Sequence, residues 1–572
     1  MEVTQGGYGC PNNNMNSCVI SEDPATNLLS AAHRKLRRPR TKKRAIGGAT
    51  NTAEKSYRSF YSITSILSAL AAYSALSVIS VFSCASIGSL MSVASIGSVL
   101  SITSTGSFLS YNSKGCFFKT NTNCAEKPEE DNPPLVQIGV PTQIKLSHGK
   151  NGTMFVSWVT AVGDCRDQNG DIPCRDCWNE DISEAFYEFP HPFHCEHPQS
   201  VVVLDHIGSF NGSANLFVSH DSVDAMHLTG KIDPTPRWIH LVQLSVLQRD
   251  TTYTYRVGSP GKWSKTFHLH TPKLDEINLI VVGDVAEGSV PSHATHMVQS
   301  GAADLYLHVG DMAYDLDSDH GWRGDSYLTQ MQSVSAHVPF HAWAGNHEIG
   351  PTCDYLAYRA RFFSQNFTSD SNSSRYYSFD IPGILHVVGI DTNVWNNEEC
   401  GGTEFSFHQA QLDWLKKDLA RVNKTETPWV IMLGHHPMYC SSSGYNVQSM
   451  PVGGCDLSFT AQFRQDLEPY MVQIVDIYIA GHIHAYERIW PTSQGQVQKS
   501  YYKPSFPSHI MTGTSGYKTE FKQASTVQNF TVLYNNIPSY TYLKIVGGTL
   551  TVEQRHNTHG NVLDTFTLKK YN

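Results

Sequence analysis

Short apolar runs that end at a glycine recur through the C-terminal half of the chain. Such runs are typical of strands that are buried on both faces. Between them, residues 407–422 and 458–475 show the spacing of apolar positions that predicts amphipathic helices. Strands that alternate with helices predict an α/β domain over residues 274–572, with two packed sheets and helices outside. The clearest runs are residues 279–282, 305–309, 430–433 and 477–480.

Residues 134–273 show another pattern, in which apolar and polar residues alternate over short stretches. A period of two is typical of strands, so this region is predicted to be an all-β domain. Its insert at residues 164–198 departs from a simple sandwich, and residues 114–133 before the domain are a predicted linker. The alternating stretches include residues 137–140, 154–159, 238–244 and 252–257, and residues 541–546 and 549–552 predict a hairpin.

Residues 58–113 carry serine at almost every third position, and no residue from Ser59 to Ser113 is charged. A long, uncharged and largely apolar stretch is a candidate membrane span, which is the interpretation that we favour. A period of three matches neither helix nor strand. The alternative is therefore a low-complexity solenoid or coil with a serine stripe along one edge.

Residues 1–57 are polar, and residues 34–44 hold eight basic side chains and no acidic one. This block is a nuclear-type patch, a phospholipid contact or a topology signal. The first 30 residues contain no apolar stretch followed by a small-residue cleavage site, so a standard secretory signal peptide is not predicted.

The length of 572 residues predicts more than one domain, and the net charge of −9 gives no support to nucleic-acid binding. Ten of the thirteen cysteines lie from Cys116 onward. An even number in a region with glycosylation sequons predicts disulfides, with Cys440 and Cys455 as the best candidate pair. The CxxC at Cys174 and Cys177 is alternatively half of a zinc site, but its acidic, loop-like surroundings favour disulfides.

Polar residues suited to metal ions follow the glycines that end the predicted strands. The carboxyl ends of strands in an open α/β sheet meet at one edge, where ligands bind. Carboxylate, amide oxygen and imidazole are ligands for iron, zinc and manganese. Two such ions clamp the attacking and leaving oxygens of a displacement and activate a bound water as the nucleophile. The residues concerned are Asp284, Asp311, Asn346, His435, His482 and His484.

Five short motifs, taken in order, resemble those of the purple acid phosphatases, a branch of the calcineurin-like metallophosphoesterases. Tyr314 in the second motif is informative, because most other metallophosphoesterases lack it. In one departure, Ala286 stands where the family usually has a glycine. The motifs are GD at 283–284, GDMAY at 310–314, GNHE at 345–348, GHHP at 434–437 and GHIHAYER at 481–488.

The all-β region resembles the fibronectin type III-like domain that precedes the catalytic domain in plant-type members, through VSWVT at 156–160 and TTYTYRVG at 251–258. The resemblance implies a metallophosphoesterase two-sheet α/β sandwich after this fibronectin type III-like β-sandwich. It does not cover the serine-rich segment.

The resemblance implies a dinuclear centre with one Fe(III) and one divalent ion, which is Zn, Mn or Fe. Asp311 would bridge the ions, and the phenolate of Tyr314 would give the iron its colour. The Fe(III) ligands would be Asp284, Asp311, Tyr314 and His484, and the divalent ion would be held by Asp311, Asn346, His435 and His482.

The resemblance also implies an acid phosphatase that hydrolyses small phosphomonoesters. His347 would contact the phosphate and give a proton to the leaving oxygen, and His436 is the nearest candidate for a second phosphate contact. Glu348 either orients His347 or lies in solvent, whereas His308 and His341 are expected in the core or behind the ligands. A phosphodiesterase or nucleotide pyrophosphatase on the same core is the alternative function. A non-catalytic, membrane-attached surface protein is a further hypothesis.

Six glycosylation sequons lie after the serine-rich segment, and none lies before it. Basic residues that flank a membrane span tend to stay cytoplasmic. The position of the sequons and the basic block at residues 34–44 together predict a type II membrane protein with an odd number of spans within residues 66–109. The phosphatase domain would then lie in the secretory pathway, at the cell surface, outside the cell or in a vacuole, and a homodimer is an expectation from the family alone. The sequons are Asn151, Asn211, Asn366, Asn372, Asn423 and Asn529.

Overall fold

A computed structural model gives the fold, and the chain divides into two compact units, Met1–Pro128 and Glu129–Asn572. The structure describes residues 90–93, 99–102, 139–161, 198–217, 237–245, 247–319, 321–351, 353–396, 405–443, 460–519, 522–523 and 528–570.

In the N-terminal unit, the described residues form two short strands, β1 (Leu90–Val93) and β2 (Val99–Ile102), which pair in parallel. Leu90 pairs with Val99, and this shift of nine residues equals three of the serine periods. The membrane interpretation of the segment and its solenoid or coil alternative both stay predictions. The rest of residues 58–113 lies outside the described residues. No helix in the described part of the chain is long and apolar enough to cross a membrane.

Two antiparallel sheets pack together in residues 142–270 and confirm the predicted β-sandwich. Trp158, Val202 and Tyr255 lie in the shared core and are almost fully buried. The predicted insert at 164–198 lies almost wholly outside the described residues. One sheet has the order β3 (Thr142–His148), β4 (Met154–Ala161), β8 (Arg237–Leu244), β7 (Ser213–Phe217). The other has the order β10 (Lys262–Trp263), β9 (Thr252–Ser259), β5 (Val201–Leu204), β6 (Gly208–Asn211), with β11 (Phe267–His270) on β9.

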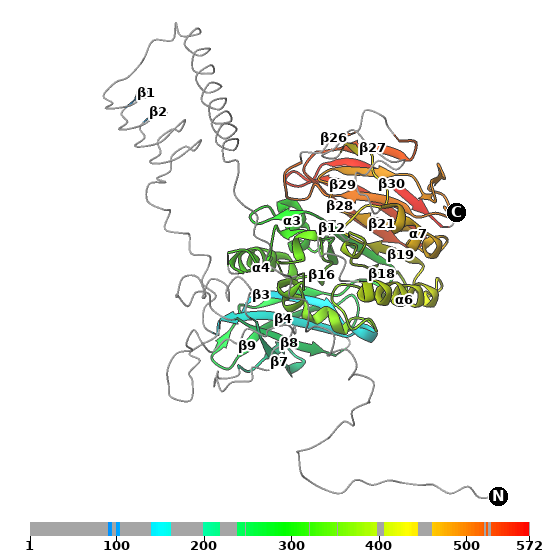
Figure 1. Cartoon of the computed structure of the whole chain (residues 1–572). Helices are drawn as coiled ribbons and strands as arrows, with labels where there is room; N and C mark the ends of the chain where they lie inside the picture. Colours follow the sequence, from blue (N-terminus) through cyan, green and yellow to red (C-terminus); the bar gives the residue numbers. More distant parts are fainter. Residues whose placement is uncertain are drawn as a thin grey trace, which may run out of the picture. The chain divides into compact units, whose positions relative to one another are not determined.

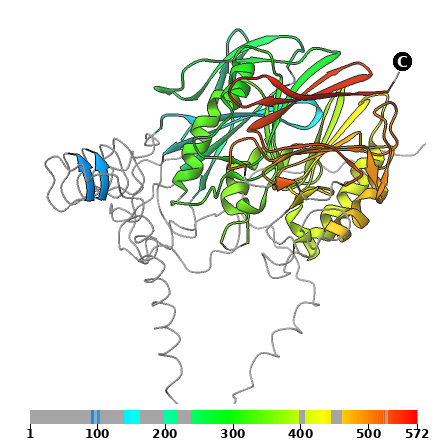
Figure 2. The same cartoon turned by 90° about the horizontal axis from the view of Figure 1, so that it is seen from above.

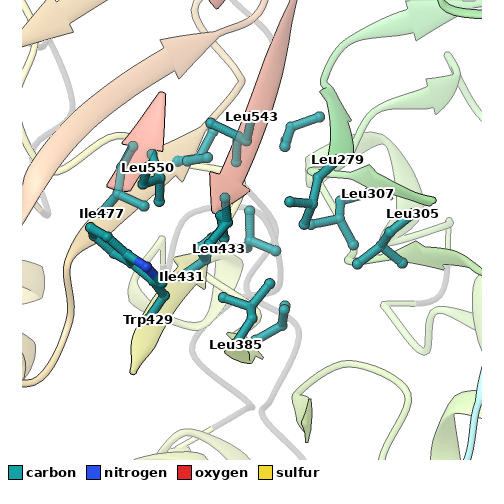
Figure 3. Close-up of a cluster of buried hydrophobic side chains, with 14 of the residues drawn as sticks. Leu279, Leu305, Leu307, Leu385, Trp429, Ile431, Leu433, Ile477, Leu543 and Leu550 are labelled. Carbon is teal, nitrogen blue, oxygen red and sulfur yellow. The ribbon is translucent and has the colours of Figure 1, made fainter. Parts of the chain in front are cut away.

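Residues 276–569 form two larger sheets that pack face to face, as the α/β pattern predicts (Figures 1 and 2). Leu279, Leu307, Leu385 and Ile431 from both sheets meet in one core (Figure 3). The first sheet has the order β16 (Phe340–Ala342), β14 (Leu305–His308), β12 (Glu276–Val282), β28 (Ser539–Val546), β29 (Thr549–His556), β30 (Val562–Lys569). The second has the order β17 (Tyr377–Ile381), β18 (Leu385–Gly389), β19 (Trp429–Leu433), β21 (Ile477–Ala480), β25 (Ser508–Thr512), β22 (Tyr486–Ile489), β27 (Thr531–Asn535).

Helices cover the outer faces of both sheets (Figure 1). Leu279 faces the core between the sheets, whereas its neighbour Ile280 packs among the helices with Met297 and Leu328. Burial on both faces explains why the strand is a continuous apolar run. The first sheet carries α3 (Ser292–Gln299) and α4 (Trp322–Ser335); the second carries α6 (Phe405–Arg421) and α7 (Thr460–Met471), which confirm the two predicted helices.

Strand β3 and helix α4 join the sandwich to the α/β domain. The hydroxyl of Ser335 in α4 donates a hydrogen bond to the main-chain oxygen of Ile144 in β3, at 2.7 Å. Beside this contact lies a buried charge cluster, in which Asp325 of α4 pairs with Arg237 of β8 and with Arg361 of α5 (Leu356–Arg361). A buried carboxylate shared by two arginines ties the two parts together.

Candidate metal centre

The seven side chains predicted as metal ligands converge at the carboxyl ends of the strands. Two short strands, β13 (Val285–Ala286) and β15 (Met312–Ala313), pair in parallel, so the loops after β12 and β14 run side by side. These loops carry Asp284, Asp311 and Tyr314, and the segments after β16, β19 and β21 carry Asn346, His435, His482 and His484.

Several of these residues have a left-handed backbone, which side chains other than glycine rarely adopt. The φ angle is +60° at Asp284, +57° at Asp311 and +67° at His482. The loops also approach one another closely, since a Cβ on Gly310 would lie 2.7 Å from the main-chain nitrogen of Gly345. Such backbone strain costs on the order of 1 kcal/mol at each position and is typical of functional sites.

Three donor atoms form a compact triangle. The amide oxygen of Asn346 lies 3.0 Å from Nε2 of His435 and 3.0 Å from Nδ1 of His482, and these two nitrogens are 3.2 Å apart. Oδ1 of Asp311 lies 3.2 Å from the same nitrogen of His435. Ligands held about 2.0–2.1 Å from one ion lie about 2.9–3.4 Å apart in octahedral or tetrahedral geometry. The spacing therefore fits one ion bound by this set.

A second group of donors surrounds His484. Its Nε2 lies 2.7 Å from the phenol oxygen of Tyr314 and 3.5 Å from Oδ1 of Asp284. Ligand atoms of Asp284, Asp311 and His435 all lie within 4.8 Å of one another, so Asp311 lies close to a member of each group. The division of these residues into ligands of two ions stays a prediction.

The electrostatics of the cluster favour a cation. Burial raises the pKa of the Asp284 carboxyl, and burial with the charges of Asp284 and Asp311 raises the pKa of the Tyr314 phenol. Burial lowers the pKa of His435, but the charge and hydrogen bond of Asp311 outweigh burial and raise it to about 10. The buried carboxylates thus attract positive charge at this site, and the donor set fits bound metal ions.

Glu348 links two of the ligand loops. Its buried carboxylate accepts hydrogen bonds from the main-chain N–H groups of Asp311 and Met312, both at 2.8 Å, and of Gly345, at 2.7 Å. It therefore neither orients the ring of His347 nor lies in solvent, the two roles that the sequence allowed. Contacts of this kind keep metal ligands in fixed orientations.

His347 lies at the edge of the cluster and is partly exposed. Its Nδ1 is 2.7 Å from Oδ1 of Asp315, and its ring centroid is 4.5 Å from that of Tyr314. Burial lowers the pKa of His347, but the Asp315 hydrogen bond and the charge of Asp311 outweigh burial and raise it to about 9. On its other side, Tyr314 stacks on Tyr517 at 3.7 Å. Asp315 and Tyr517 carry no sequence signal, because each is recognisable only by its neighbours in space.

His436, the predicted second phosphate contact, is fully buried. Its Nδ1 lies 2.7 Å from the hydroxyl of Thr392, and its ring centroid is 4.3 Å from that of His482. It lies beside His435 and His482, and its contact with phosphate stays a prediction. His308 and His341 are also fully buried, as expected for core positions.

A two-sheet α/β sandwich with carboxylate, amide and imidazole donors at its strand ends defines a metallophosphoesterase. The family model described as calcineurin-like phosphoesterase matches residues 277–486. The model described as the N-terminal domain of purple acid phosphatase matches residues 206–271, within the β-sandwich. The predicted domain limits outside these matches stay predictions.

Individual relatives agree with this class. The acid phosphatase type 7 of Danio rerio is 31% identical over 355 residues, which are 58% of this chain and 78% of that protein. Purple acid phosphatase 18 of Arabidopsis thaliana is 27% identical, over 66% of this chain and 71% of its own. The purple acid phosphatase PPD1 of yellow lupin shares the fold, with a TM-score of 0.55 at 19% identity, over 76% of this chain and 75% of that one. The chain belongs to the purple acid phosphatase family, and the predicted enzyme class, a phosphoric monoester hydrolase, is confirmed.

Proposed function

We propose that the chain is an acid phosphatase that hydrolyses small phosphomonoesters at an Fe(III)–M(II) centre, where M is zinc, manganese or iron. The observation that supports it is the convergence of two donor sets on Asp311. The phenol of Tyr314 beside His484 favours a trivalent ion in one set, because a phenolate is a hard, anionic donor. Bound ions would polarise the phosphoryl oxygens and activate a water as the nucleophile.

The side chains around the centre have separate tasks in this proposal. His347, partly exposed at the edge of the cluster, would bind the phosphate and protonate the leaving oxygen. Glu348 holds the loops of Asp311 and Gly345 together and so keeps the donors at one spacing. Tyr517, stacked on Tyr314, would shield that phenol from water.

Metal analysis combined with matched substrates tests the proposal. Protein loaded with Fe(III) and Zn should bind two ions per chain, absorb visible light and hydrolyse p-nitrophenyl phosphate at pH 5. Bis(p-nitrophenyl) phosphate should be hydrolysed about 100-fold more slowly. Faster hydrolysis of the diester would support the phosphodiesterase alternative. Two bound ions without hydrolysis of either compound would support a non-catalytic protein.

We further propose that the unit Glu129–Asn572 lies in the lumen of the secretory pathway or outside the cell, anchored through residues 66–109. Cys353 and Cys440 each take part in a disulfide bond, and disulfides persist in oxidising compartments. Cys455, the predicted partner of Cys440, lies outside the described residues. Asn366 is half-buried, and the exposed sequon asparagines are Asn151, Asn211, Asn372, Asn423 and Asn529.

Sealed microsomes separate the parts of this second proposal. The expected result is a glycosidase-sensitive C-terminal unit that is protected from protease and stays in the membrane after alkaline extraction. An unglycosylated protein digested in sealed vesicles would contradict the lumenal location. A glycosylated protein that alkali releases would contradict the anchor alone.

A further inference from the structure

A cavity of about 790 Å³ lies where the β-sandwich meets the α/β domain. Its wall includes His148 at the end of β3, His386 near the start of β18 and Thr427 just before β19. The cavity is therefore at the amino ends of β18 and β19, whereas the proposed metal ligands follow the carboxyl ends of strands. None of those ligands is among the described residues of the wall. The volume is within the range of about 300–1,000 Å³ that is typical of ligand pockets.

Two of the predicted glycosylation sites belong to this wall. Asn151 lies in the turn between β3 and β4, Asn423 lies two residues after the end of α6, and both are exposed. Oδ1 of Asn423 accepts hydrogen bonds from the main-chain N–H of Thr425, at 3.0 Å, and from its hydroxyl, at 2.7 Å. These contacts leave Nδ2 of Asn423, the atom that carries an N-linked sugar, without a hydrogen bond to the described residues.

An ion bridge connects the two sites. Oδ1 of Asp370 lies 2.8 Å from Nζ of Lys150, which directly precedes the first of these asparagines. Oδ2 of Asp370 lies 3.3 Å from Nη1 of Arg421, two residues before the second asparagine. A third sequon asparagine, Asn372, is exposed and lies two residues after Asp370. Three sequons that are far apart in the chain therefore lie around one cavity.

The charged groups of the wall are largely paired with one another. The two cations of the ion bridge share one carboxylate, and the ring nitrogens of His386 lie 2.7 Å from Asp380 and 3.0 Å from Asp418. Both nitrogens of this buried histidine are thus occupied, so it is not free to bind a metal ion. Trp414 and Phe379 add aromatic surface to the wall. Paired charges beside aromatic surface suit a neutral ligand with hydroxyl groups and apolar C–H faces, which is the chemistry of a sugar.

Glu426 supplies a hydrogen-bond acceptor beside one attachment site. Unlike the other acidic side chains of the described wall, it makes no hydrogen bond or ion pair with the described residues. Its main-chain N–H donates to the main-chain oxygen of Asn423 at 2.9 Å, so the two residues share one turn. A carboxylate accepts hydrogen bonds, and the hydroxyl and acetamide groups of a sugar donate them. A sugar attached to Asn423 also has a high effective concentration in the cavity, so weak contacts are enough to hold it.

We propose that Asn423 carries an N-linked glycan whose first N-acetylglucosamine occupies this cavity, contacts Glu426 and so links the two domains. This inference rests on the lumenal location proposed above. In glycosylation, Nδ2 of Asn423 bonds to C1 of the sugar of a lipid-linked oligosaccharide donor. The diphosphate of the donor leaves that carbon, and Nδ2 loses one proton. Glycans on Asn151 and Asn372 would extend from the rim of the cavity.

Release of the glycan by a peptide N-glycosidase tests whether the cavity holds the sugar. The full chain is produced in a glycosylating eukaryotic host, and the loss of sugar at each sequon is followed by mass spectrometry. If the sugar occupies the cavity for about nine-tenths of the time, native release at Asn423 should be about tenfold slower than at Asn529. Asn529 is the matched control, because it is exposed and lies outside the wall. After denaturation the two rates should be equal.

A variant of the proposed contact tests the role of Glu426. Glu426→Ala should speed native release at Asn423 by about three- to tenfold, because one hydrogen bond to a charged group is lost. Asp413→Asn changes an exposed carboxylate of α6 outside the wall and should leave the rate unchanged.

Thermal unfolding measures the link between the domains. Asn423→Asp lacks the sugar but keeps an oxygen that accepts from Thr425. Because the sugar binds the folded chain alone, this variant should unfold about 1–2 °C below the wild type. Asn529→Asp should unfold within about 0.5 °C of the wild type, since its sugar has no cavity to fill.

Three results would overturn the inference: equal native release at Asn423 and Asn529, slow release at Asn423 without a lower midpoint for Asn423→Asp, or sugar at other sequons but none at Asn423. The second result would mean that crowding at the attachment site, and not the cavity, slows the enzyme. A chain without sugar at any sequon would instead contradict the lumenal location. None of these measurements depends on phosphatase activity.

Discussion

The phenol oxygen of Tyr314 lies 2.7 Å from Nε2 of His484, although 170 residues separate them in the chain. Two donors this close fit a common ion. We predict that Tyr314→Phe abolishes the visible absorption of the Fe(III)-loaded protein and lowers its iron content, measured by absorbance and mass spectrometry. Tyr517→Phe is the matched control, because its ring stacks on Tyr314 and should leave the band in place. A colourless wild type with two bound metals would contradict the assignment.

Glu348→Gln should weaken metal binding while keeping the side-chain volume. The carboxylate accepts from three main-chain N–H groups, those of Asp311, Met312 and Gly345, and a glutamine must turn its NH₂ group toward at least one of them. We expect a loss of about 10- to 100-fold in affinity, measured by competition with a chelator. Glu287→Gln, an exposed residue near Asp284, should bind metal as the wild type does. Equal metal affinities for the wild type, Glu348→Gln and Glu287→Gln would refute the role given to Glu348.

Lys145→Met should stabilise the protein in acid. Burial, and then the nearby charge of Arg361, lower the pKa of the Lys145 ammonium from 10.5 to about 7. Below pH 7 this lysine is charged in both the folded and the unfolded chain, so the full cost of burying the charge is present. Between pH 7 and 10.5 the unfolded chain binds more protons, and wild-type stability rises with pH.

At pH 5–7 the unfolding free energy of Lys145→Met should therefore be higher than that of the wild type, by a few kcal/mol in order of magnitude. This advantage should shrink as the pH approaches 10. Urea unfolding at several pH values measures it. Lys150→Met, which removes an exposed partner of Asp370, is the control and should change stability by less than about 1 kcal/mol. An advantage for Lys145→Met that is independent of pH would show that packing, and not charge, is the cause.

Asp325→Ala should destabilise the joined domains strongly. It leaves Arg237 and Arg361 without the buried carboxylate that both contact. Removing one partner of a buried ion pair costs about 3–5 kcal/mol, because the remaining charge stays desolvated. Asp370→Ala also removes a carboxylate shared by two cations, but this one is exposed, so the loss should stay below about 1 kcal/mol. Urea midpoints that shift by the same amount in both variants would contradict this argument.

Local pattern was enough to predict much of the architecture. The apolar run at 279–282 and the helical stripe at 407–422 each depend on residues close in sequence, and both elements are present as β12 and α6. The hairpin of β28 and β29 follows from alternation around a glycine pair. The serine-rich segment shows the limit of this approach, because its period of three matches neither regular element. The parallel register of Leu90 with Val99 came only from the structure.

The sequence by itself determined the types of donor and their order, because a glycine and a polar residue after a buried strand form a local signal and the carboxyl ends of neighbouring strands must meet. Only the tertiary structure decided that His482 presents Nδ1 and His484 presents Nε2, that Glu348 accepts from the backbone of Asp311, and that Asp315 reaches His347. These contacts join residues 32 to 170 positions apart. Their geometry depends on sheet register and on strained loop conformations, and neither leaves a periodic trace in the chain.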